Sequence, residues 1–93
     1  MTAFLEILAF YYLCDSVSQL RTLDPTEVLR CTAAYEQVKA HFQPLEGPGT
    51  HGEGRTANAA AYLGFKAWEA DNADLVGDLR RTAEGAARRN PVL

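Results

Sequence analysis

The sequence predicts an all-α protein, and three features of it support this fold class. Alanine is abundant and β-branched residues are sparse, which favours helix over strand. Apolar residues recur at spacings of three and four, as they do along one face of a helix. One run rich in proline and glycine divides the chain, and the pattern on either side of it is helical. We therefore expect one helical domain over residues 1–93.

A first helix is predicted over about residues 2–21. Its second half carries one apolar stripe, whereas its first half, from Phe4 to Cys14, is apolar around almost its whole circumference. A helix that is apolar all round must be buried all round, and a domain this small rarely achieves that alone. We therefore expect this half to self-associate with a second chain. The residues predicted for self-association are Phe4, Leu8, Tyr11 and Tyr12.

A second helix is predicted over about residues 25–43. Asp24 is a suitable N-cap, Pro25 fits the first turn, and Glu27 completes a capping box. Pro44 ends the helix. The linker before this helix is very short, so helices 2–21 and 25–43 should form an antiparallel hairpin. The expected apolar stripe is Val28, Cys31, Tyr35, Val38, Phe42 and Leu45.

A glycine- and proline-rich loop over residues 44–54 precedes a third helical segment over about 56–89. Asp71 or Asn72 could cap a fourth helix, so this segment is either continuous or broken near residues 71–73. If continuous, it is about 50 Å long, whereas each arm of the hairpin is about 30 Å. Either the segment folds back, or a second chain covers the remainder. Together with the apolar first helix, this length favours a homodimer or a larger oligomer.

Two cysteines, Cys14 and Cys31, lie at nearly the same height across the predicted hairpin. No secretory signal or membrane-spanning run is recognisable, so we expect a cytoplasmic protein without membrane contact. Cytosol is reducing, and two small buried thiols are therefore favoured over a disulfide.

The glycine loop has the spacing of a phosphate-binding loop, but an arginine replaces the required lysine and a helix, not a strand, precedes it. A weaker anion site remains as an alternative, although Glu53 would repel an anion and a flexible connector is favoured. Its residues would be His51, Gly52, Gly54 and Arg55.

Catalytic, metal and cofactor sites are not expected. His41 and His51 are the only histidines and lack partners at metal-ligand spacing, and both cysteines should lie in or beside the core. A nucleophile also needs a base and an orienting group, and no such arrangement is evident.

Charge is segregated in the third segment. Asp71, Asp74 and Asp78, together with Glu69, form an acidic patch that is either a solvated surface, the favoured interpretation, or a docking site for a basic partner. Four arginines follow it: Arg80, Arg81, Arg88 and Arg89. They could contact phosphates, but the net charge of −3 and the lack of a recognisable helix-turn-helix argue against nucleic-acid binding.

The sequence thus favours a small, acidic, non-enzymatic protein that acts through protein–protein interaction. An inhibitor, adaptor or regulator of the kind found in phages and mobile elements is the leading hypothesis, by analogy of size and charge. Its expected partners are a second copy of itself and another protein. One alternative is a module that binds a small molecule or nucleotide phosphate at the glycine loop. Another is a nucleic-acid-associated regulator that uses the C-terminal arginines.

Overall fold

The structure, a computed structural model, describes residues 3–42 and 54–93, with the side chains of α3 described from residue 58 onwards. These residues form four helices and no strand, which confirms the all-α prediction. The helices are α1 (Ala3–Leu20), α2 (Pro25–Ala40), α3 (Gly54–Asp71) and α4 (Ala73–Arg89). The helical segment predicted over residues 56–89 is therefore broken into two helices, which is one of the two expected alternatives.

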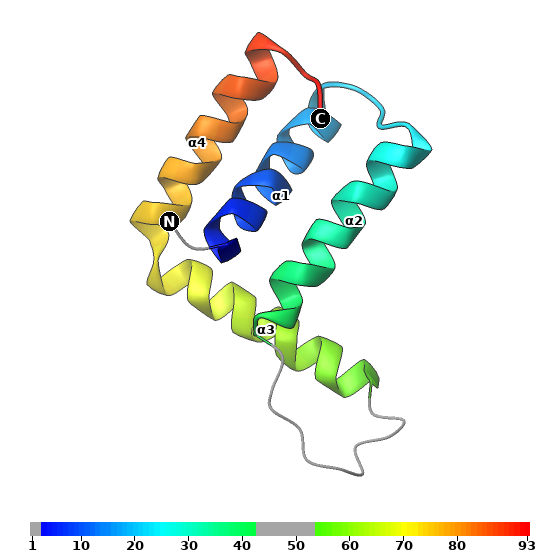
Figure 1. Cartoon of the computed structure of the whole chain (residues 1–93). Coiled ribbons are helices and arrows are strands. Elements are labelled where there is room, and N and C mark those ends of the chain that lie inside the picture. Colours follow the sequence, from blue (N-terminus) through cyan, green and yellow to red (C-terminus); the bar gives the residue numbers. More distant parts are fainter. Residues whose placement is uncertain (1–2, 43–53) are drawn as a thin grey trace.

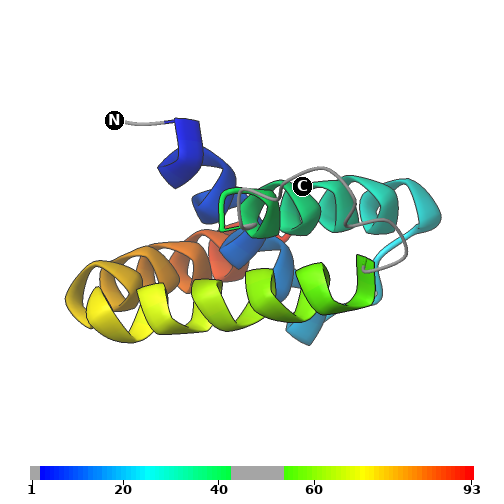
Figure 2. The same cartoon turned by 90° about the horizontal axis from the view of Figure 1, so that it is seen from below.

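The helix α1 lies between α2 and α4, and α3 crosses the end at which α1 begins (Figure 1). In this view, α2 runs in the opposite direction to α1, whereas α4 runs in the same direction as α1 (Figure 1). Seen from below, α1 is strongly inclined to both neighbours, so its first turns stand on one side of them and its last turns on the other (Figure 2).

Asn72 separates α3 from α4. Its backbone leaves the helical region, with φ −122° and ψ 40°, and its side-chain amide donates a hydrogen bond to the Trp68 carbonyl at 2.9 Å. Asn72 is thus the residue before α4, but its side chain satisfies the last turn of α3 instead of capping α4. This break lets α4 return along α1 and removes the length argument for a second chain.

The core lies where α1, α2, α3 and α4 converge. Its fully buried centre includes Leu8, Tyr12 and Val38, with Phe65 and Val76 against them. Aromatic rings close the end near the start of α1: Phe4 stacks on His41 at 4.2 Å between ring centroids and meets the edge of Trp68 at 5.3 Å.

The buried side of α2 differs in part from the predicted stripe. Val38 is fully buried as expected, but Val28 is 47% exposed, and Ala34 takes part in the buried face instead. Leu45 lies outside the described residues. Small Ala34 belongs on this side because α1 and α2 approach closely there, held by a disulfide.

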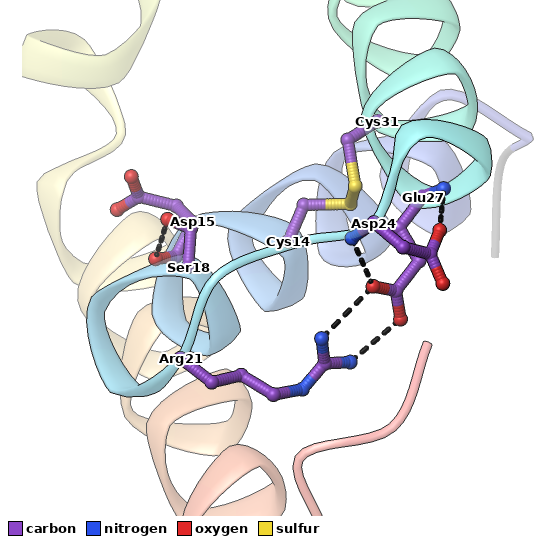
Figure 3. The surroundings of a disulfide bond; sticks show 7 residues. All are labelled: Cys14, Asp15, Ser18, Arg21, Asp24, Glu27 and Cys31. Atoms are coloured by element: carbon purple, nitrogen blue, oxygen red, sulfur yellow. Dashed lines mark hydrogen bonds and ion pairs between the residues drawn. A yellow bond between two sulfur atoms is a disulfide. The ribbon is translucent and has the colours of Figure 1, made fainter.

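Cys14 and Cys31 form that disulfide, with 5.9 Å between their Cα atoms (Figure 3). The prediction of two free thiols is wrong. It follows from an expected reducing compartment, so the disulfide weighs against that premise as well. The two residues do lie opposite each other, and their Cα separation is within the range that a disulfide requires.

The capping box at the start of α2 is confirmed. The Asp24 carboxylate accepts a hydrogen bond from the Glu27 amide at 2.8 Å, and the Glu27 carboxylate accepts one from the Asp24 amide at 2.9 Å (Figure 3). Arg21 adds a two-pronged ion pair to Glu27, at 2.6 and 2.8 Å. Its Nε also donates to the Pro91 carbonyl at 2.8 Å, which fastens the end of the chain to the end of α1.

Candidate functional site

The first half of α1 has one buried side and one side that faces two surface grooves. Leu8 and Tyr12, which are 0% and 1% exposed, define what we call the closed face. Phe10 lies on the opposite side, is half-buried, and lines both grooves. We call Phe10 and these two grooves the open face of α1.

The larger groove lies between α1 and α2 and has a volume of about 440 Å³. Its floor is apolar, and its polar groups are a carboxylate, a guanidinium and an amide. The Arg30 guanidinium lies 5.4 Å from the centroid of the Phe10 ring, a cation–π distance. The lining residues are Glu6, Ile7, Phe10, Arg30, Ala33, Ala34 and Gln37.

The smaller groove lies between α1 and α4 and has a volume of about 240 Å³. All of its lining side chains except that of Thr82 are purely apolar. They are Ala9, Phe10 and Leu13 from α1, and Leu79, Thr82, Ala83 and Ala86 from α4. Phe10 therefore forms a ridge between two apolar depressions, an arrangement suited to holding apolar side chains of another molecule.

On the closed face, a buried carboxylate joins three helices. Glu69 of α3 is 8% exposed and accepts hydrogen bonds from the Tyr12 hydroxyl at 2.5 Å and from Arg80 at 3.0 Å. Lys66 completes the cluster, with its Nζ 2.7 Å from the other Glu69 oxygen. The Arg80 guanidinium also lies 4.3 Å from the centroid of the Tyr12 ring.

The protonation of this cluster fits a structural tether. Burial alone would raise the pKa of Glu69, but hydrogen bonds from Lys66 and Tyr12 outweigh it, and its pKa lies below the ordinary value. Burial and the hydrogen bond to Glu69 raise the pKa of Tyr12. The pKa values of both groups are thus shifted further from neutral pH, whereas an acid–base catalyst needs a pKa near the pH at which it works.

The predicted acidic patch divides between two environments. Asp71, Asp74 and Asp78 are exposed around the corner between α3 and α4, and Asp78 pairs with Arg81. Glu69 lies apart from them, buried in the cluster just described. The sequence carries a signal for this, because Glu69 follows Ala61 and Phe65 at intervals of four and so shares their buried side.

The predicted self-association residues lie in one chain's interior. Leu8 and Tyr12 are fully buried, and Phe4 and Tyr11 pack partly buried against the core. Tyr11 stacks on Tyr35 at 5.2 Å between ring centroids. The single chain thus covers Leu8 and Tyr12 fully and Phe4 and Tyr11 in part, which weakens the second reason for expecting an oligomer. The sequence pattern did not indicate Phe10 as the exposed member of this apolar half.

The remaining candidates are placed as follows. His51 and Gly52 lie outside the described residues, and Gly54 and Arg55 begin α3 before its described side chains. Of the four C-terminal arginines, Arg80 bonds to Glu69, whereas the others are exposed.

Residues 3–42 and 54–93 contain no group of three or more histidine, cysteine or acidic side chains that could hold a metal ion. Within the same residues no helix has the length and apolar character needed to cross a membrane.

No family model matches the chain, and comparison with curated proteins and with solved structures likewise finds no match.

Proposed function

We propose that this protein is a non-enzymatic interaction module that binds an amphipathic helix of a partner protein at the open face of α1. The observation that carries the proposal is the position of Phe10 between two grooves with apolar floors. A half-buried aromatic residue flanked by depressions is the kind of anchor that dominates the binding energy of protein interfaces.

A helical ligand fits the shape of this face. Both grooves run between neighbouring helices, and such grooves bind the apolar side of an amphipathic helix through residues three, four and seven apart. Glu6, Arg30 and Gln37 along the larger groove supply polar groups for the rim of the contact. A polar rim around an apolar centre is the usual composition of such interfaces.

The exposed carboxylates of Asp71, Asp74 and Asp78 favour a partner that carries positive charge. They would attract a basic segment and orient its approach, with more effect on the association rate than on affinity. Glu69 has no part in this, because its carboxylate is held by Tyr12, Lys66 and Arg80.

An inhibitor, adaptor or regulator of the small kind carried by phages and mobile elements remains our proposed class, and it rests on size and net charge. The disulfide fits an oxidising compartment better than a reducing cytosol. The proposed binding does not depend on a cytoplasmic location.

The test compares Phe10→Glu with a matched control, Leu63→Glu. Glutamate favours helix and would lie beside Arg30, so Phe10→Glu should fold. Leu63 is 65% exposed on α3 and lines neither groove. Proteins captured by wild-type chain from source cells are purified, and their affinity for each variant is measured by calorimetry.

We expect Phe10→Glu to weaken binding about thirtyfold, the effect of losing an anchor worth about 2 kcal/mol. Leu63→Glu should bind like the wild type. Equal affinity of Phe10→Glu and wild type for every captured protein would overturn the proposal, provided that circular dichroism shows both to be folded.

A further inference from the structure

We propose that the groove between α1 and α4 takes a second copy of this chain, whose own α4 lies antiparallel in it. This inference rests on the proposed function, because it names one partner for part of the open face. It does not rest on Leu8 or Tyr12, which the single chain buries.

The side of α4 that borders the groove has the spacing of a helix-pairing surface. Leu75, Leu79, Thr82 and Ala86, which we call the seam, follow one another at spacings of four, three and four, as do the apolar positions of a heptad. Leu75 is 37% exposed, although it is a large apolar residue, and Thr82 is exposed. This seam continues from the groove onto the open surface of α4.

Side-chain size along the seam favours the antiparallel direction. The first half of the seam carries two leucines, whereas the second half carries Thr82 and Ala86. An antiparallel copy sets the leucines of each chain against the small residues of the other. Large side chains then enter the space that small ones leave, and packing at native density requires such interdigitation.

Charge along α4 favours the same direction. Asp74 lies in the first turn and Arg88 and Arg89 lie in the last turn, whereas Asp78 and Arg81 between them form an ion pair within the chain. Antiparallel pairing about a two-fold axis brings acidic and basic ends together twice, whereas parallel pairing would bring like charges together. Arg80 does not disturb this, because its guanidinium is turned inward to Glu69.

The first test measures association by sedimentation equilibrium over a range of concentrations. Wild type is compared with Asp74→Arg/Asp78→Arg, with Arg88→Glu/Arg89→Glu, and with an equimolar mixture of the two. We expect wild type to dimerise, each double variant to dissociate at about tenfold higher concentration, and the mixture to regain wild-type affinity.

The matched control, Asp15→Arg/Glu36→Arg, reverses two exposed carboxylates on α1 and α2 and should dimerise like the wild type. A wild-type chain that is monomeric at every concentration would overturn this inference. So would a dimer that neither charge reversal weakens. Loss of partner binding in Phe10→Glu alongside a monomeric wild type would leave the proposed function intact.

The second test fixes the direction of pairing with a zero-length carbodiimide cross-linker and the variant Arg89→Lys. Within one chain, Asp74 and residue 89 are separated by about 22 Å along α4, too far for a direct amide bond. Lys39 and Glu36, 3.2 Å apart, serve as the intramolecular control. A cross-linked dimer joined between Asp74 and Lys at position 89 supports the antiparallel arrangement, and dimers joined only elsewhere contradict it.

Discussion

The closed and open faces of α1 are both formed by large apolar side chains of one helix, but only the closed face is fully buried. Leu8 and Tyr12 are buried together with core residues of α2, α3 and α4, whereas Phe10, two residues from each, is only half-buried and faces two grooves. Figure 2 shows that α1 is steeply inclined to α2 and α4, and the two grooves beside Phe10 lie between α1 and these two helices. An apolar helix surface therefore need not be core, and its role depends on which element crosses it.

The largest expected effect is on the closed face. Leu8→Ala should lower the free energy of unfolding by about 2 to 5 kcal/mol, because it leaves a cavity among fully buried side chains. Phe10→Ala should cost about 1 kcal/mol, since its ring already contacts solvent. Urea denaturation of both variants measures the difference, and equal losses would contradict the division of α1 into two faces.

Removal of the disulfide should have the second-largest effect on the free energy of unfolding. Cys14 lies one turn beyond Phe10, and there the bond to Cys31 closes the side of α1 that is open at Phe10. The double variant Cys14→Ser/Cys31→Ser frees a loop with a sequence separation of 17 and should cost about 3 kcal/mol. Urea denaturation with and without reductant checks this: wild type should lose stability on reduction, and the double variant should not respond.

Changes at the buried carboxylate of Glu69 should have a smaller effect on stability, and part of that effect should depend on Tyr12. Glu69→Gln weakens the ion pairs to Lys66 and Arg80 and should cost about 1 to 3 kcal/mol. Tyr12→Phe should cost about 1 kcal/mol. A double-mutant cycle should give a coupling of about 1 kcal/mol between them, and strictly additive losses would show that the hydrogen bond contributes nothing.

The smallest expected effect is acid sensitivity at the junction of α1 and α2. The hydrogen bonds from Arg21 and the Asp24 amide lower the pKa of Glu27 to about 2, against an ordinary value of 4.5. A carboxyl whose folded pKa is depressed stabilises the fold above its unfolded pKa and loses that contribution as pH falls. The urea midpoint should therefore drop between pH 4.5 and 2, and Glu27→Gln should flatten part of that drop.

Much of the local structure was predictable from the sequence. The capping box at Asp24 and Glu27 and the four-residue repeat that ends at Glu69 are local signals, and each corresponds to an observed contact. Gly64 lies at a close approach of α3 to the end of α2, since a Cβ there would lie only 3.3 Å from that of Phe42.

The arrangement of helices was not predictable in the same way. Whether Asn72 breaks the third segment decides if α4 can return along α1, and propensity alone leaves both outcomes open. That return, together with α3, buries Leu8 and Tyr12 and leaves Phe10 beside grooves. The disulfide was missed because the expectation came from a supposed compartment and not from the geometry of Cys14 and Cys31.

The most direct test of this account measures folding and binding in Phe10→Glu on the same preparation. We expect Phe10→Glu to have helical content and a urea midpoint close to those of Phe10→Ala, together with weakened binding of the partner protein and a weaker dimer. A well-folded Phe10→Glu chain that binds the partner and dimerises like wild type would contradict it, because the open face would then have no role in recognition. If Phe10→Glu does not fold, Phe10→Ala gives the same decision: undiminished affinity would refute the account.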